Sequence, residues 1–146
     1  MALDLGELRI GVALSDETET LASALTTLRA AGARKDAHAV ANLAREHHVA
    51  ELVVGVPWRL DGSCGPQAAK ALAFVERLRR SLRLPVVTRD ERLSSVAAAE
   101  RLRAAGVKAR DGKGRIDRAA AALVLQEYLD ERRAAAVRSP SAGAVA

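Results

Sequence analysis

The stretch MALDLGELRIGVAL, residues 1–14, decides the fold class. It contains two apolar runs, residues 1–5 and 9–14, and only Gly6, Glu7 and Leu8 stand between them. Two short apolar runs joined by a glycine-containing connection predict a β-hairpin. The chain is therefore expected to begin with two antiparallel strands.

The rest of the chain alternates between apolar runs of strand length and segments in which apolar residues recur at helical spacing. The pattern predicts a third strand within residues 21–28, a helix over 35–48, a strand over 50–56, a helix over 66–82 and a strand over 85–88. Helices over about 94–106 and 115–133 follow, with a basic loop at 107–114 between them. Antiparallel strands followed by strand–helix alternation match the RNase H-like arrangement, an α/β fold in which a mixed five-stranded sheet carries helices on both faces. We expect one domain over residues 1–133 and a disordered tail over 134–146.

Composition excludes several classes of protein. The 146-residue chain has one cysteine, which excludes a disulfide framework and a multi-cysteine zinc site. It has one Phe, one Trp and one Tyr, too few for the modules that stack bases on aromatic side chains. No apolar run is long enough to span a membrane and no signal-peptide pattern is present, so we expect a soluble, cytoplasmic protein. Arginines and lysines cluster in residues 77–92 and 108–118 and favour a surface that faces phosphates, although a net charge of +5 more often serves solubility.

Three carboxylates are expected at one edge of the predicted sheet. Asp4 lies in the first strand, Glu91 follows the last strand, and Asp117 opens the final helix. Asp117 also heads a stripe of apolar, mostly small residues on one helix face: Ala120, Ala121, Val124 and Tyr128. An acid at the head of a stripe that packs on a sheet is costly unless something pairs with it.

Each carboxylate also has a simpler explanation. Asp4 suits a turn, Glu91 could pair with a neighbouring arginine, and Asp117 would complement the dipole of a helix at its first turn. Three carboxylates close together would instead raise one another's pKa values, a conflict that a divalent cation removes. Oxygen ligands without His or Cys suit Mg²⁺ or Mn²⁺, and two such ions roughly 4 Å apart can activate a water and stabilise the leaving oxygen of a phosphodiester. The pattern therefore predicts metal-dependent phosphodiester hydrolysis.

Four blocks of sequence carry a more specific signal when they are taken together. They are residues 4–16 (DLGELRIGVALSD), residues 54–57 and 61–63 (VGVP and DGS), residues 90–95 (DERLSS) and residues 113–120 (KGRIDRAA). In this order and spacing they resemble the YqgF/RuvX family, the RuvC-like Holliday junction resolvases also described as pre-16S rRNA nucleases. The resemblance covers residues 1–133. It implies that Asp4, Glu91 and Asp117 are the catalytic metal ligands, with Asp90 as an auxiliary acid.

The resemblance also implies how the substrate is held. Arg9 and Arg92 would bind phosphate or brace the acids, although each could equally form a structural ion pair. Ser63 would contact the substrate backbone, unless its loop serves only to cap the next helix. Lys113 and Arg115 precede Asp117 and are expected to border the metal site, with a solvated basic linker as the alternative.

The function that follows is hydrolysis of phosphodiester bonds in structured nucleic acid, during maturation of the 16S rRNA 5′ end. The alternatives are the resolution of Holliday junctions in DNA and a non-catalytic role in binding RNA or the ribosome. The expected partners are pre-rRNA or branched DNA, and no membrane. The chain is expected to act as a monomer or a homodimer, since junction resolution requires two active sites on one substrate.

Overall fold

The structure is a computed structural model that describes residues 1–90 and 109–138, with side chains in the second range from residue 116 onward. The elements follow one another as β1 (Ala2–Leu5), β2 (Arg9–Ser15), β3 (Ala22–Arg29), α1 (Ala33–Glu46), β4 (Leu52–Val56), α2 (Pro66–Ser81), β5 (Val86–Asp90) and α4 (Ala109–Arg138). The predicted hairpin is confirmed as β1 and β2. The predicted helix over 94–106 lies outside the described residues.

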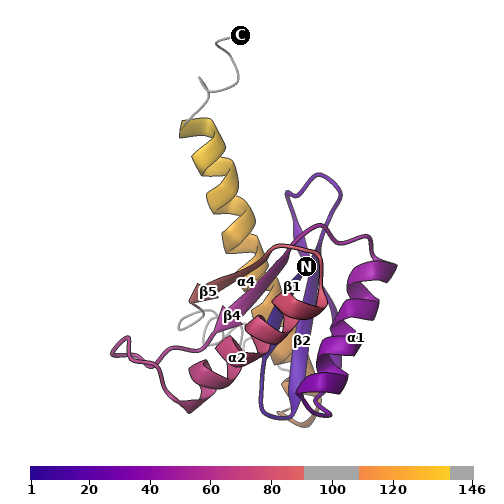
Figure 1. Ribbon diagram of the computed structural model, residues 1–146. Helices are drawn as coiled ribbons and strands as arrows, with labels where there is room; N and C mark the ends of the chain where they lie inside the picture. Colours follow the sequence, from indigo (N-terminus) through magenta and orange to yellow (C-terminus); the bar gives the residue numbers. More distant parts are fainter. Residues whose placement is uncertain (91–108, 139–146) are drawn as a thin grey trace.

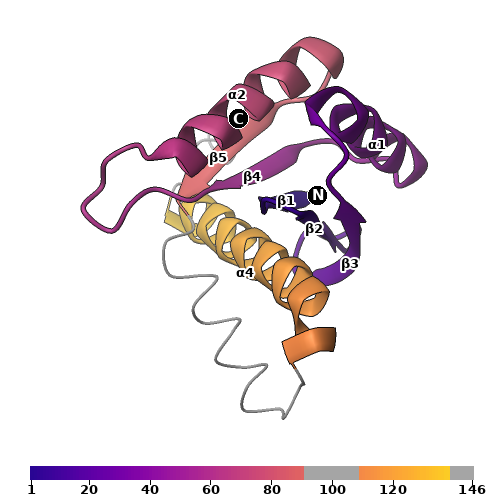
Figure 2. The same cartoon turned by 90° about the horizontal axis from the view of Figure 1, so that it is seen from below.

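The five strands form one mixed sheet in the order β3-β2-β1-β4-β5. β1, β2 and β3 pair antiparallel, whereas β1, β4 and β5 pair parallel. Helices α1 and α2 cover one face of this sheet, and α4 crosses the other face (Figures 1 and 2). The predicted α/β fold, a mixed five-stranded sheet with helices on both faces, is confirmed.

Two apolar layers hold the sheet between its helices. Under α1 and α2 the core consists of larger side chains, among them Leu3, Val12, Val54 and Leu78, all essentially inaccessible to water. Under α4 the layer contains smaller residues of the sheet and of the helix: Ala2, Ala13, Val53, Ala121 and Val124, with Leu125 and Leu129. Small residues on both surfaces allow a helix to approach the sheet closely, because packing in the interior leaves few voids.

The last helix is longer than the sequence pattern predicts. It begins at Ala109 rather than at residue 115, and it continues through residues 134–138, which the pattern assigned to the tail. Gly112 and Gly114 favour a loop because each costs about 1 kcal/mol in a helix interior relative to Ala, yet a formed helix gains one hydrogen bond for each residue added. At the other end, Ala134–Ala136 are strong helix formers, and the first residue that disfavours continuation is Pro140.

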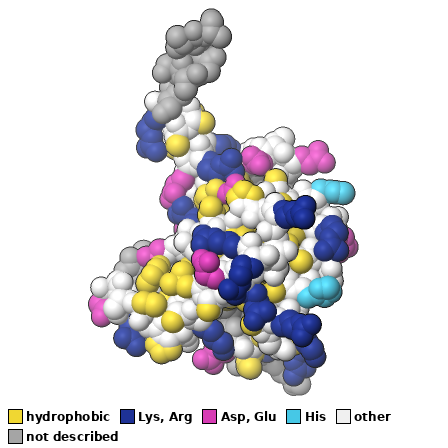
Figure 3. All heavy atoms as spheres, viewed as in Figure 1, with side chains coloured by type: hydrophobic (Ala, Val, Ile, Leu, Met, Phe, Trp, Pro, Cys, Tyr) yellow, Lys and Arg dark blue, Asp and Glu magenta, His cyan; other side chains and the backbone are white. Residues whose placement is uncertain are grey.

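The surface formed by α1 and α2 is rich in cationic side chains, which gather over both helices in Figure 3. The carboxyl ends of β1 and β4 lie at the end of the sheet where α1 and α2 begin. Among the described residues, none of the helices combines the length and the apolar character needed to cross a lipid bilayer.

Candidate active site

Asp4 occupies the centre of the sheet. It lies in the middle strand, opposite Gly11 of β2 on one side and Gly55 of β4 on the other. The side chain is directed to the α4 face, because residues of one strand alternate between faces and Ala2, two positions earlier, packs under α4. Asp4 is 7% exposed and is the one buried charged residue among those described. A carboxylate at such a place is costly to ionise unless a cation or hydrogen-bond donors compensate it.

Gly11 allows α4 to reach this carboxylate. A Cβ atom built on Gly11 would lie 2.0 Å from the backbone oxygen of Asp117 and 2.7 Å from the backbone nitrogen of Arg118. No side chain can occupy that space, so the backbone of α4 lies directly on the backbone of β2. Because Gly11 is the register partner of Asp4, the same contact places Asp117 beside Asp4.

Asp117 is half-buried and responds electrostatically to Asp4. Burial, and secondly the negative charge of Asp4, raise the pKa of Asp117 to about 6, while the positive charge of Arg9 opposes the shift. Asp117 is the ninth residue of α4 rather than the residue that opens the helix, as the sequence predicted. Since the dipole effect fades within the first turn, complementing the dipole does not explain an acid at this position.

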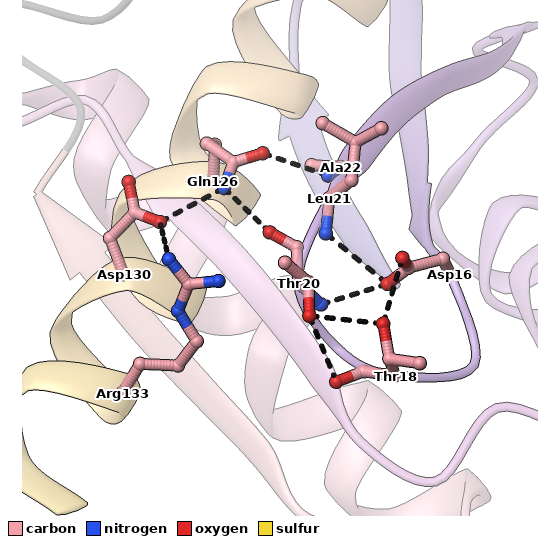
Figure 4. Close-up of polar contacts among 8 residues, drawn as sticks. All are labelled: Asp16, Thr18, Thr20, Leu21, Ala22, Gln126, Asp130 and Arg133. Carbon is pink, nitrogen blue, oxygen red and sulfur yellow. Dashed lines mark hydrogen bonds and ion pairs between the residues drawn. The ribbon is translucent and has the colours of Figure 1, made fainter. Parts of the chain in front are cut away.

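Three polar contacts fix α4 on the sheet. Arg118 donates from Nη1 to Oγ1 of Thr27 at 3.3 Å. Gln126 holds the loop between β2 and β3: its Oε1 accepts from the backbone N–H of Ala22 at 2.8 Å, and its Nε2 donates to the backbone oxygen of Thr20 at 2.9 Å (Figure 4). These contacts bind α4 to β3, on the far side of β2 from Asp4.

The loop that Gln126 holds is itself closed by a carboxylate. Asp16 accepts hydrogen bonds from the backbone N–H groups of Thr20 and Leu21 and from the hydroxyl of Thr18 (Figure 4). These donors hold the pKa of Asp16 below its usual range. The hydrogen bonds of this turn thus serve the attachment of α4 and not the carboxylate pair.

The opposite edge of the sheet is tied to α4 by an ion pair. Arg89 of β5 lies in the same row across the sheet as Asp4, with Gly55 between them. Its guanidinium group donates from both terminal nitrogens to Glu131 of α4, with an Nη2–Oε1 distance of 2.7 Å. Bidentate geometry of this kind fixes orientation as well as distance.

The structure places two of the predicted substrate contacts near the expected end of the sheet. Arg9 begins β2, and its charge acts on Asp117. Ser63 lies in the exposed loop that follows β4, where its hydroxyl donates to Asp61 at 2.6 Å. The loop does not cap α2 through a side chain, because the N-cap residue is Gly65 and makes no side-chain hydrogen bond.

Of the other predicted site residues, Asp90 lies within the described part of the chain, where it ends β5 opposite Val56. Glu91 and Arg92 lie outside the described residues, and the side chains of Lys113 and Arg115 do as well. Within the described ranges, no three His, Cys, Asp or Glu side chains come together as a metal site.

Sequence reasoning missed two glycines beside Asp4. Gly11 and Gly55 flank Asp4, and they keep the space beside it free of side chains. A signal for Gly11 was present, because a two-residue hairpin turn at Glu7 and Leu8 pairs Gly6 with Arg9 and hence Asp4 with Gly11. No comparable signal in the sequence identifies Thr27 as the partner of Arg118.

Comparison with known proteins agrees with this arrangement. A family model described as RuvX, a Holliday junction resolvase, matches residues 1–131. A protein of Anaeromyxobacter dehalogenans (strain 2CP-C) is 47% identical over 132 residues, which make up 90% of this chain and 96% of that protein. Proteins of Roseiflexus sp. (strain RS-1) and Chloroflexus aggregans (strain MD-66 / DSM 9485) are 44% and 46% identical, each over 91% of this chain and 94% of the relative. All three carry the name "Putative pre-16S rRNA nuclease". The resemblance seen in the sequence is thereby confirmed, and the chain belongs to the RuvX family of nucleases, hydrolases that act on phosphodiester bonds.

Proposed function

We propose that residues 1–133 form a single metal-dependent nuclease domain that cleaves structured RNA during maturation of the 16S rRNA 5′ end. The observation that carries the proposal is the juxtaposition of Asp4 and Asp117 on the α4 face of the sheet. One carboxylate is 7% exposed, and the other has a pKa raised to about 6 in part by the first. Two acids held in mutual repulsion are an unfavourable arrangement for a purely structural site.

The residues present fit a hard divalent cation. Asp4 and Asp117 offer carboxylate oxygens, and neither His nor Cys lies with them among the described residues. Oxygen-only sites favour Mg²⁺ or Mn²⁺ over zinc. We infer that Asp4, Asp117 and Glu91 would hold the cation, with Asp90 as an auxiliary acid. When bound, such an ion supplies a nucleophilic hydroxide at neutral pH and stabilises charge on the phosphodiester.

The side chains of the chain itself prepare the site for that charge. Because the pKa of Asp117 is about 6, this carboxyl group is mostly ionised under neutral conditions. Gly11 keeps the two acids close, since any larger residue would push α4 away. Arg9 acts electrostatically on Asp117 and is available to a phosphate oxygen at the same end of β2. We assign Arg92, Lys113, Arg115 and Ser63 to contacts with the substrate backbone.

RNA is favoured as the substrate by the names of the relatives, which are pre-16S rRNA nucleases over nearly their full length. The description of the family favours a second candidate, the resolution of four-way DNA junctions. That reaction requires two active sites on one substrate and therefore a homodimer, whereas RNA processing can proceed with a monomer. In either role the protein would act on nucleic acid in the cytoplasm. Binding to the ribosome is a further interaction to be tested.

The test compares the cleavage of a 16S rRNA precursor that retains its 5′ leader with the cleavage of a four-way DNA junction. We expect wild-type protein with Mn²⁺ to cut the precursor, EDTA to stop the reaction, and Asp4→Asn to remove nearly all cleavage. Glu17→Gln is the matched control, because Glu17 is an exposed acid in the loop after β2. Cleavage of the junction alone would replace the first candidate with the second. RNA binding without cleavage of either substrate would contradict both.

A further inference from the structure

The two helices on the face opposite α4 form a continuous surface. α1 and α2 lie side by side and run in the same direction, as two cavities between them show. A cavity of about 260 Å³ at their first turns is lined by Ala33 and Asp36 of α1 and by Lys70 of α2. A second cavity, of about 300 Å³, lies between Arg45 at the end of α1 and Leu82, which follows α2. The seam between the two helices thus opens into a cavity at each end, and we call this seam the groove.

Cationic side chains border this groove on both sides. On α1, Arg34 and Arg45 are eleven residues apart, which is three helical turns and hence the same side of the helix. On α2, Lys70 and Arg77 are seven residues apart and share one side in the same way. Lys70 and Arg45 line the two cavities, so both of these rows face the groove. Further cations extend the surface outward: Lys35, Arg80 and Arg83, all exposed.

Three acids, Asp36, Glu46 and Glu76, offset part of the charge of the seven cations on the two helices. Asp36 accepts a hydrogen bond from the backbone N–H of Ala31 at 2.8 Å, next to the start of α1. Glu76 pairs with Arg79 at 2.7 Å, on the side of α2 away from the groove. Glu7 and Asp36 line the cavity at the first turns together with Lys70. The outer surface of α1 and α2 nevertheless keeps a net positive charge, and cationic side chains gather there in Figure 3.

We propose that this groove, bordered by Arg34, Arg45, Lys70 and Arg77, binds the sugar–phosphate backbone of the substrate RNA beyond the segment that is cleaved. The proposal rests on the proposed function, since it extends the binding of the same RNA. Arginine suits phosphate oxygens because its planar group donates in two directions. The three turns from Arg34 to Arg45 span about 16 Å, along which a nucleic-acid duplex presents about nine phosphate charges. Contacts to phosphate carry affinity without reading the sequence.

The groove also begins at the end of β1 that lies next to Asp4. The cavity at the first turns of α1 and α2 is lined by Leu5, Gly6 and Ile10 as well as by Lys70. Leu5 is the residue next to Asp4, so the groove opens at the end of β1 where the carboxylates lie on the other face. RNA with one part at Asp4 can therefore pass around the end of the sheet and continue along the groove.

The test measures RNA binding in EDTA, where cleavage is stopped, as a function of salt concentration. The groove variant is Arg45→Gln with Lys70→Gln, because both residues are exposed and lie at opposite ends of the groove. The control is Arg133→Gln with Arg138→Gln, which removes the same charge from exposed positions near the end of α4. Two lost phosphate contacts reduce the slope of log K against log salt by about 1.4 for single strands and about 1.8 for a duplex. At 0.1 M salt, the smaller of these values corresponds to binding that is about 25-fold weaker.

The expected result is that the groove variant loses this affinity for a structured precursor RNA, while the control stays within about twofold of wild type. A short oligonucleotide that fills only the cleavage site should be bound and cut equally by all three proteins. If the groove variant binds the long RNA as wild type does, with a parallel salt dependence, the inference is wrong and the surface serves another partner, such as an acidic protein. Failure of wild-type protein to bind or cut any RNA would instead reject the proposed function.

Discussion

Replacing Asp117 with Asn should make the metal-free protein more stable while it removes activity. Burial and the charge of Asp4 raise the pKa of Asp117 from 3.8 to about 6. At 1.36 kcal/mol for each unit, the ionised form of Asp117 destabilises the folded state by up to about 3 kcal/mol. Because Asp117 is only half-buried, solvent screening reduces this figure, and we expect Asp117→Asn to gain about 1 to 1.5 kcal/mol at pH 7.5. For a chain of this size the gain corresponds to a rise in Tm of about 3–5 °C.

The pH dependence of this gain follows from the direction of the shift. Between pH 3.8 and 6 the folded protein holds a proton on Asp117 that the unfolded chain has already lost. The contribution of Asp117 to stability is therefore fully present below pH 3.8 and is lost as the pH rises to 6. The Asn variant has no such proton, so the difference in the free energy of unfolding between variant and wild type should grow through this window. Above pH 6 the difference should remain constant.

The assay is urea unfolding of both proteins in EDTA at several pH values, repeated with Mn²⁺. A cation at a free concentration of one hundred times its Kd stabilises the folded state by about 2.7 kcal/mol. The variant should lose most of this stabilisation, because it lacks one of the proposed ligands. The order of stability is thus expected to reverse: the variant is more stable in EDTA, and wild type is more stable in Mn²⁺. In an Asp4→Asn background the gain in EDTA should be smaller, because one cause of the raised pKa is gone. If Asp117→Asn is destabilising in EDTA at every pH, the two carboxylates do not interact as described.

Four further changes test other parts of the structure. Gly11→Ala should destabilise the protein by about 3 kcal/mol and abolish cleavage, since the added Cβ meets the backbone of α4; urea unfolding with no loss of stability would contradict that close approach. Gln126→Ala should cost about 1 to 2 kcal/mol by removing two hydrogen bonds to the loop after β2, which thermal unfolding will measure. Neutralising Lys113 and Arg115 together should weaken RNA binding for all sequences alike and flatten its salt dependence by about 1.4 to 1.8, whereas an unchanged slope would make the segment a solvated linker. Cys64→Ser should leave folding and cleavage unchanged under reducing conditions, because the thiol is exposed; a slower rate would give the cysteine a role in the reaction.

The sequence predicts the strands well where their burial produces a clear pattern of apolar residues. β4 is buried along its whole length, Leu52–Val56, and therefore forms an uninterrupted apolar run that ends at Pro57. α2 begins with Pro66 at its first position, where the missing N–H costs nothing. The ends of α4 were not predictable in the same way, because glycine content and helix propagation oppose each other there. At the C-terminal end, Ala134–Ala136 favour a longer helix, although no apolar face marks these residues as part of it.

The sequence predicts that Asp4 and Asp117 belong to the site, but it does not predict the surroundings that raise the pKa of Asp117. Sequence reasoning identified Asp4 and Asp117, but it placed Asp117 in the first turn of a helix, where a carboxylate is favourable. In the structure Asp117 lies two turns further on, where α4 rests on Gly11. The small residues that let the helix approach are also what bury Asp117 and bring it beside Asp4, so the raised pKa and the paired carboxylates have one cause. Replacing Gly11 with a larger residue therefore separates the two acids. Replacing Asp117 with Asn instead keeps the packing of α4 on β2, but it removes one of the ligands proposed for the cation.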